Sequence, residues 1–122
     1  MEATELMIGD WVGVFDEGIM KDCRQVDWIR TGEIGMRYHK VWAIGCIEPI
    51  PLTPEILEKN GWNHSNRLMI TRIDDNDFYW SEELGGILYK NQYNMCNCKY
   101  VHNLQHALRL CGLDELADNF KI

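Results

Sequence analysis

The segment over residues 100–111 constrains the fold more than any other part of this 122-residue chain. Gly112 follows it, at the position where a left-handed residue commonly ends a helix. The apolar residues of the segment recur at three- and four-residue steps, so a helix gathers them on one stripe: Val101, Leu104, Ala107, Leu108 and Cys111. The pattern predicts a core helix at about 100–111, with polar residues that face away from the core: Asn103, Gln105, His106 and Arg109.

Local sequence signals predict two shorter helices. Three prolines between residues 48 and 57 make the backbone run extended, after which Thr53 can cap a helix that has Pro54 at its first position. This helix is expected at about 54–60. A short terminal helix is expected at about 113–120, where a second apolar stripe follows the glycine: Leu113, Leu116, Ala117 and Phe120.

Strand signals fill most of the remaining chain, roughly in residues 6–48 and 66–90. Apolar and aromatic runs alternate there with turn residues, and the run 74–77 has the composition of a hairpin turn. Residues 62–66 read as a polar loop, and residues 91–99 fit no element clearly. The expected fold class is α+β, with a curved, mainly antiparallel β-sheet or a small partly open barrel that the long helix covers. The length is that of a single domain, residues 1–122.

Composition and charge exclude several classes of function. The net charge of -7 disfavours generic nucleic-acid binding, because such binding needs a basic surface. No run approaches the roughly 20 apolar residues of a membrane span, and the first residues lack the pattern of a signal peptide. Five cysteines is an odd number. We therefore expect an acidic, soluble, cytoplasmic protein without disulfides, for which a protein partner with a basic surface is one option.

One group of residues has the right types for a zinc site: Cys96, Cys98, His102 and His106. The two histidines lie one helical turn apart and could share an ion. However, the two cysteines are separated by one residue rather than the usual two, and no second cysteine pair supports them. The alternative is a loop with two incidental thiols, followed by a helix whose histidines contact solvent or cap the helix. We predict no metal and no cofactor.

Nucleophilic catalysis would need a cysteine and a histidine that meet in space. Cys46 with His39 or His64 is the pairing that the sequence offers. The chain contains no phosphate-binding glycine loop, zinc-protease helix or serine-nucleophile motif. We therefore predict a buried cysteine and solvated histidines, and no catalytic residues.

Three segments of the chain resemble an uncharacterised family of small proteins encoded in genomes, prophages and mobile elements of gut Bacteroidales. The matching stretches are residues 6–12, residues 49–62 and residues 100–105 with the acidic turn 112–116, and they contain the patterns IGDWV, PIPLTPEIL and YVHNLQ. The start of the last helix, Tyr100-Val101-His102, is typical of the family, whereas Cys96, Cys98 and His106 are not. The resemblance implies no activity, because the family has no assigned function.

Two hypotheses for the function follow from these observations. The first is a small non-enzymatic, soluble protein-interaction module of prophage or mobile-element origin. The alternative is a small enzyme or zinc-binding protein with a site built from dispersed residues, for which His39, His64, His102 and the cysteines are the raw material. An exposed strand edge could also pair with a second copy of the chain, and the sequence leaves the oligomeric state open.

Overall fold

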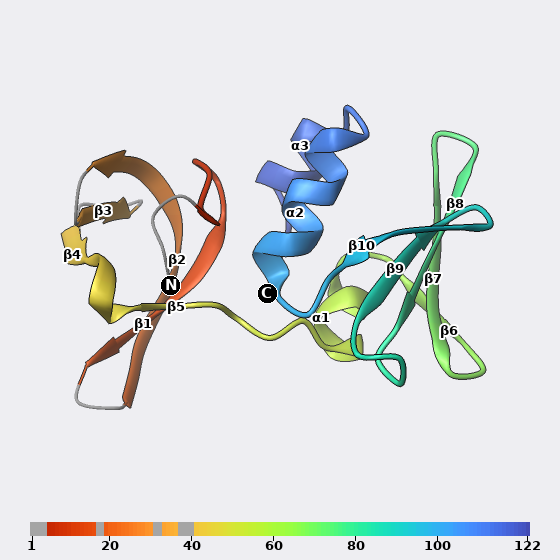
Figure 1. Cartoon of the computed structure of the whole chain (residues 1–122), viewed down its shortest axis with the longest axis horizontal. Helices are drawn as coiled ribbons and strands as arrows, with labels where there is room; N and C mark the ends of the chain where they lie inside the picture. The colour runs from red at the N-terminus through yellow and green to blue at the C-terminus, as the bar shows by residue number, and fades with distance from the viewer. Residues whose placement is uncertain (1–4, 17–18, 31–32, 37–40) are drawn as a thin grey trace.

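The proline-rich segment that leads to Thr53 separates two runs of strand-forming residues, and each run folds into its own antiparallel sheet (Figure 1). The computed structural model describes residues 5–16, 19–30, 33–36 and 41–122. Within these residues neither sheet closes into a barrel, and two helices lie between the sheets. The predicted α+β class with curved antiparallel sheets is confirmed. None of the described helices is long and apolar enough to span a membrane.

The N-terminal sheet has five strands in the order β4-β3-β2-β1-β5. Strand β2 is long enough to pair with β1 along its first part and with β3 along its second, with a register shift between Val26 and Trp28. The indole ring of Trp28 occupies the space that a Cβ on Gly35 would need, so this position accepts only glycine. The strands are β1 (Trp11–Asp16), β2 (Ile19–Arg30), β3 (Glu33–Met36), β4 (Val41–Ala43) and, after a 3-10 turn, β5 (Ile47–Glu48).

The C-terminal sheet is a meander in the order β10-β9-β8-β7-β6. Asp74 and Asp75 have φ values of 49° and 64°, as a tight hairpin between β7 and β8 requires, and the predicted turn is confirmed. The predicted strand ranges missed both edge strands, because these strands are largely polar and exposed and carry no alternating apolar pattern. The strands are β6 (Asn63–Ser65), β7 (Leu68–Ile73), β8 (Asn76–Ser81), β9 (Ile87–Lys90) and β10 (Tyr93–Asn97).

The short helix α1 (Pro54–Lys59) begins as the sequence predicts. The side-chain oxygen of Thr53 accepts a hydrogen bond from the Ile56 amide at 3.2 Å, and Pro54 occupies the first turn. Gly61, with φ of +85°, follows the end of the helix. Leu57 is fully buried and joins the core of the C-terminal half.

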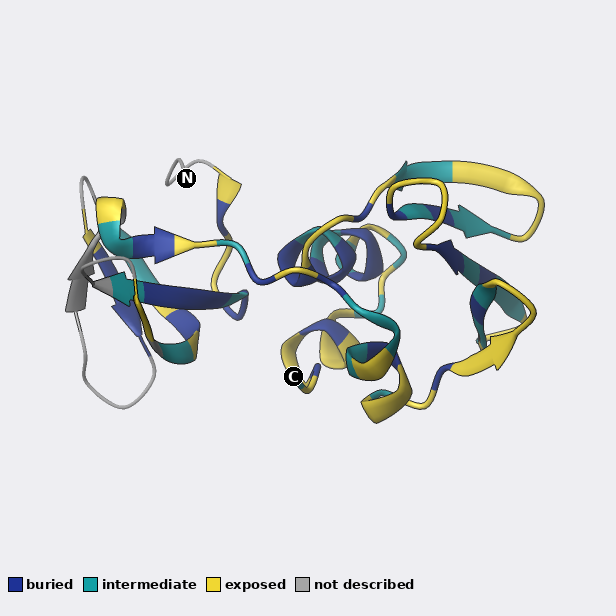
Figure 2. Cartoon of the chain, turned by 90° about the horizontal axis from the view of Figure 1, so that it is seen from below, coloured by how far each residue is buried: buried dark blue, intermediate teal, exposed yellow. Residues whose placement is uncertain are grey.

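Helix α2 (Val101–Leu110), followed by α3 (Asp114–Asp118), lies between the two sheets (Figure 2). Its apolar stripe packs into the core of the C-terminal half, and Gly112 has φ of +76°, so the predicted helix and its end are confirmed. The opposite side of α2 does not face solvent. His102 and Gln105 are 3% and 0% exposed, and the Gln105 side chain is hydrogen-bonded to the backbone of Gly9 and Trp11. The expectation that the polar residues of this helix are dispersed and solvated is therefore wrong.

The two halves have separate apolar cores. The larger core joins α1, α2, α3 and the C-terminal sheet, and the smaller one lies within the N-terminal sheet. The smaller core consists of Leu6, Val12, Val14, Val26, Ile34, Met36 and Ile47. Apolar side chains also connect the halves, because Trp11 and Cys23 of the N-terminal sheet pack against the larger core, and hydrogen bonds from Trp11 to Gln105 and Phe120 add to this contact.

Leu104 on α2 provides a test of the larger core. Its side chain is fully buried, so Leu104→Ala should lower the free energy of unfolding by about 2–5 kcal/mol through lost burial and a residual cavity. Leu110→Ala on the same helix is the matched control, because Leu110 is 83% exposed and its truncation should cost less than about 0.5 kcal/mol. Urea denaturation measures both values. Equal losses in the two variants would contradict the assigned orientation of α2.

Candidate functional site

The turn that precedes β1 packs the N-terminal sheet against α2 and α3. Gly9 adopts φ of +93°, and its amide donates to the Val26 carbonyl at 2.7 Å, so the turn is held against β2. A Cβ at Gly9 would lie 2.6 Å from Oδ1 of Asp118 and 2.9 Å from Nη2 of Arg109. Glycine is therefore required here both for its backbone conformation and for the close approach of the helices.

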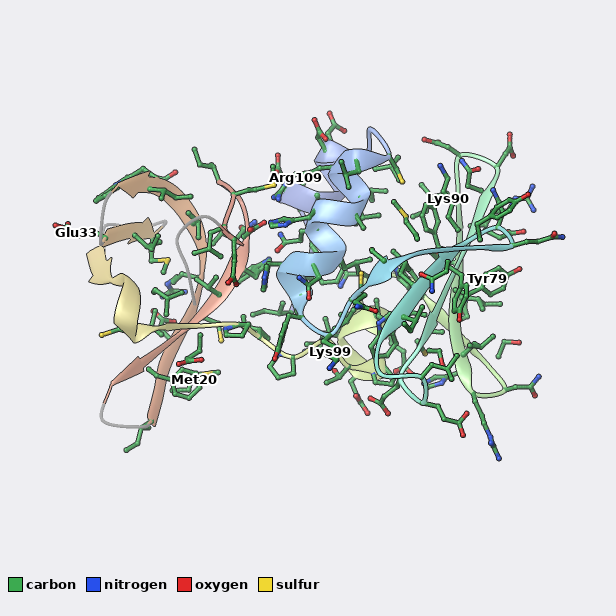
Figure 3. All side chains as sticks on the ribbon, in the orientation of Figure 1. Met20, Glu33, Tyr79, Lys90, Lys99 and Arg109 are labelled. Carbon is green, nitrogen blue, oxygen red and sulfur yellow. The ribbon has the colours of Figure 1, made fainter. Side chains whose placement is uncertain are left out.

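The carboxylate of Asp10 is completely buried at this contact and has three donors. Nε2 of His106 and Nη1 of Arg109 each lie 2.6 Å from one of its oxygens, and the Met7 amide donates at 2.8 Å. Arg109 also lies 3.3 Å from Asp118. A buried carboxylate is tolerated only when it is paired and hydrogen-bonded, and this one is both. Figure 3 shows Arg109 on the side of α2 that faces the N-terminal sheet.

Two buried glutamines complete the contact. The side-chain amide of Gln105 donates to the carbonyls of Gly9 and Ala117 at 2.9 and 2.8 Å, and its oxygen accepts from the Trp11 amide at 2.8 Å. Gln25 donates to the carbonyls of Gly9 and Asp118 at 3.0 and 2.7 Å. We call the five side chains of this contact the polar clasp: Asp10, Gln25, Gln105, His106 and Arg109.

The polar clasp acts as a structural joint. Its buried carboxylate and amide groups are engaged within the protein, and the clasp contains no serine, threonine or cysteine that could serve as a nucleophile beside His106. Sequence reasoning missed Asp10, Gln25 and the roles of Gln105 and Arg109. The available signal was the pattern IGDWV, which places a carboxylate inside an apolar run, together with polar residues on the helix that it meets.

A polar pocket of about 520 Å³ opens at the same junction. We call it the junction pocket. The N-terminal half contributes Glu5, Glu48 and Pro49, and the C-terminal half contributes Asn97, Lys99, Tyr100, His102 and Asn103. Because residues on both sides of the polar clasp line it, its shape depends on how the two halves are joined. Figure 3 shows Lys99 near the base of α2, where the chain enters the helix.

His102 is the least satisfied polar group in the described part of the chain. Its Nδ1 is buried without a hydrogen-bond partner among the described residues, and its Nε2 lies 3.5 Å from the side-chain nitrogen of Asn103. The oxygen of that Asn103 amide accepts from the Tyr100 amide at 3.1 Å, which fixes its orientation. If Nε2 accepts a hydrogen bond from Asn103, Nδ1 must carry the proton and remains unpaired. Neither neutral tautomer pairs both nitrogens.

Aromatic neighbours hold the His102 ring in place. Tyr100 stacks on it with ring centroids 5.9 Å apart, and His106 meets it edge to face at 5.5 Å. Burial lowers the pKa of His102, and the nearby His106 adds to this, while the carboxylates of Asp10 and Glu5 oppose it. His102 is therefore a neutral imidazole at physiological pH, with one buried ring nitrogen that has no hydrogen-bond partner among the described residues.

The structure brings the four zinc candidates together only in pairs. Cys96 and Cys98 have their sulfurs 3.5 Å apart, and His102 contacts His106. In the described part of the chain, no group of three or more His, Cys, Asp or Glu side chains is arranged to hold a metal. Zinc binding at these residues lacks geometric support.

The candidate nucleophile pairs do not assemble either. Cys46 lies just before β5 in the N-terminal sheet, whereas His64 lies on β6 in the other sheet, 2.6 Å from a carboxylate oxygen of Glu58. His39 lies outside the described residues. Within the described residues, the Cys46–His64 pairing therefore gives no nucleophile beside a base.

Comparisons with protein-family models, curated proteins and solved structures find no match to this chain. The resemblance to the Bacteroidales family stays a prediction. Functional inference therefore depends on the contacts of the chain's own residues.

Replacement of Asp10 tests the polar clasp. Asp10→Asn keeps the shape of the side chain but removes the charge that pairs with Arg109, and breaking such a buried pair costs about 3–5 kcal/mol. We expect the lower end, because Arg109 retains its contact with Asp118. Asp75→Asn is the matched control, since that side chain is 99% exposed. Chemical denaturation of both variants makes the comparison, and equal stabilities would refute the role of the clasp.

The lowered pKa of His102 predicts a dependence of stability on pH. Since the unfolded chain takes up this proton at the ordinary pKa of 6.5 and the folded protein only at a lower pH, stability should fall as pH drops through 6.5. The slope for one group is at most about 1.4 kcal/mol per pH unit. His102→Phe should flatten the curve of unfolding free energy against pH in this window. Val101→Ala should lower stability but leave the slope unchanged, and an unchanged slope in His102→Phe would argue against the assignment.

Proposed function

We propose that the protein is a non-enzymatic protein-interaction module that binds an extended, basic segment of a partner protein at the junction pocket. The observation that carries the proposal is the buried His102, which lines a polar pocket and lacks a full set of hydrogen-bond partners among the described residues. Concave sites with a few convergent polar groups are the usual places for ligands. A partner group that accepts from or donates to this imidazole would complete its hydrogen bonding.

Charge favours a basic ligand. Glu5 and Glu48 place two carboxylates on one wall of the junction pocket, and the whole chain carries a net charge of -7. The Tyr100 ring is 36% exposed and offers an aromatic surface to an arginine or lysine side chain. Lys99, on the other wall, can donate to a carbonyl oxygen of the same segment. The negative surface would also speed the approach of a basic partner.

The neighbouring strand favours an extended ligand. β10 forms one edge of the C-terminal sheet, and its last residue, Asn97, lines the junction pocket. This strand contains neither proline nor a charged residue, so its edge does not repel an incoming strand. A second copy of the chain is a poorer occupant. Both copies carry the same net charge of -7, so two acidic surfaces would repel each other.

The residues of the junction pocket support binding better than catalysis. Among the described residues that line it there is no serine, threonine or cysteine, so His102 has no hydroxymethyl or thiol nucleophile to activate. The lining of the junction pocket therefore does not favour the small-enzyme alternative. A cytoplasmic setting belongs to the same proposal, and the five free cysteines are compatible with a reducing compartment. The prophage or mobile-element origin is also part of the proposal, and it depends on the family resemblance alone.

Selection of peptides on the immobilised protein tests this function. A displayed library of random peptides should yield binders enriched in arginine and lysine, with affinities that Glu48→Lys weakens at least about tenfold, or 1.4 kcal/mol. The matched control is Glu115→Lys, which makes the same charge change on the exposed surface of α3 and should leave the affinities unchanged. Enrichment of peptides without basic residues, or equal losses in both variants, would overturn the proposal.

A further inference from the structure

The end of β10 places two thiols side by side in different environments. Sγ of Cys96 lies 3.5 Å from Sγ of Cys98, which is within contact distance for two sulfurs. Cys98 is completely buried in the larger core, whereas Cys96 is partly exposed. Side chains two residues apart on an extended chain point to the same face, which explains why this spacing brings the sulfurs together. Cys96 can therefore react with a reagent from solvent, whereas Cys98 lies beside it in the interior.

The buried member of the pair is held by its backbone. The Cys98 amide donates to the Gly86 carbonyl at 2.5 Å, and the Cys98 carbonyl accepts from the indole nitrogen of Trp80 at 2.8 Å. Gly86 has φ of +86°, and a Cβ there would lie 2.8 Å from the Cys98 oxygen. These contacts fix the backbone of Cys98, and its side chain is completely buried, so we expect closure between the two sulfurs to depend mainly on movement of Cys96.

The hydrogen bond between the two thiols shifts their pKa values in opposite directions. The hydrogen bond with Cys98 lowers the pKa of Cys96 to about 7, although partial burial opposes this. The same bond, together with burial, raises the pKa of Cys98. At neutral pH a large part of Cys96 is therefore thiolate, the form that reacts as a nucleophile. A thiolate that solvent can reach, next to a second thiol, is the arrangement found in redox-sensitive cysteines.

We propose that Cys96 and Cys98 form a two-electron redox site that a hydroperoxide oxidises to a disulfide, with Cys96 as the attacking thiol and Cys98 as the resolving thiol. The proposal is independent of the junction pocket and of any partner. It assigns a chemistry to a pair that the sequence offered only as metal ligands.

The reaction has two steps. In the first, the Cys96 thiolate attacks one oxygen of the hydroperoxide, the O–O bond breaks, Cys96 becomes a sulfenic acid, and hydroxide or alkoxide leaves. In the second, Cys98 loses its proton and attacks the Cys96 sulfur, the S–O bond breaks, and the departing hydroxide takes up that proton as water. The two sulfurs together give two electrons to the hydroperoxide. The first step also removes the hydrogen bond that raises the pKa of Cys98, which favours the second.

The resulting disulfide should be easy to reduce. Residues two apart in an extended strand have Cα atoms about 6.6 Å apart. This is close to the upper limit of about 6.8 Å for disulfides, and strained disulfides have more oxidising potentials. A small thiol reductant would attack one sulfur, form a mixed disulfide and, with a second thiol, restore both cysteines. The site is therefore reversible.

Cys23 provides an internal control. It is partly exposed like Cys96, but burial and the neighbouring Asp22 raise its pKa, and its sulfur lies 3.5 Å from the thioether of Met20 rather than from a thiol. Lowering a thiol pKa from 9 to 7 increases the thiolate fraction at neutral pH but reduces the reactivity of each thiolate. The net gain in the reaction rate at neutral pH is on the order of five- to tenfold. Cys96 should therefore react with hydrogen peroxide faster than Cys23 by at least this factor.

The experiment treats the reduced full-length protein with hydrogen peroxide and follows the tryptic peptide 91–99, which contains both thiols, by mass spectrometry. Wild type and Cys23→Ser should lose two hydrogens from this peptide, and dithiothreitol should reverse the change. Cys98→Ser should instead accumulate a sulfenic acid at Cys96 that dimedone traps. The alkylation rate of Cys96 plotted against pH should have its midpoint near 7.

Several results would overturn the inference. These are a Cys96 that reacts no faster than Cys23, an alkylation midpoint near 9, or over-oxidation of Cys96 in wild type without a disulfide to Cys98. The alkylation profile and the loss of two hydrogens from peptide 91–99 are both measured on the unaltered protein, so together they decide the question even if a serine variant fails to fold.

Discussion

The buried carboxylate of Asp10 joins the two halves of the molecule. Each sheet has its own apolar core, and the partly buried side chains of Trp11 and Cys23 add an apolar contact between the N-terminal sheet and the larger core. Hydrogen bonds and ion pairs are directional, and the contacts of Asp10 with His106 and Arg109 select a single arrangement. A buried charge makes this selection strict, because any other arrangement would leave the carboxylate without its partners.

The same arrangement produces the junction pocket. Glu48 lines it from the N-terminal half, whereas Tyr100 and His102 line it from the start of α2, before the clasp residues of that helix in the chain. The contact that aligns the two halves therefore also sets the distance between Glu48 on one side of the pocket and Tyr100 and His102 on the other. Changes in the clasp and changes in ligand binding are expected to be linked through this shared geometry.

The features of the fold that the sequence predicts are those set by short-range patterns of residues. The Thr53 cap, the stripe of α2 and its terminal glycine each depend on residues close together in the chain, and all are present. The polar clasp could not be predicted, because Asp10 and His106 are 96 residues apart and periodicity carries no information on such pairs. For the same reason, polar residues opposite an apolar stripe were expected to face water. The sequence identified Cys96 and Cys98 as notable, but only coordinates show that one sulfur is buried behind the other.

The separation of 96 residues between Asp10 and His106 also bears on how the chain matures. A ribosome adds about 5–20 residues per second, so roughly 5–20 seconds pass between the synthesis of the acid and that of the base. Until α2 has been synthesised, Asp10 lacks both of its side-chain partners, so this contact cannot form while the strands of either sheet are being made.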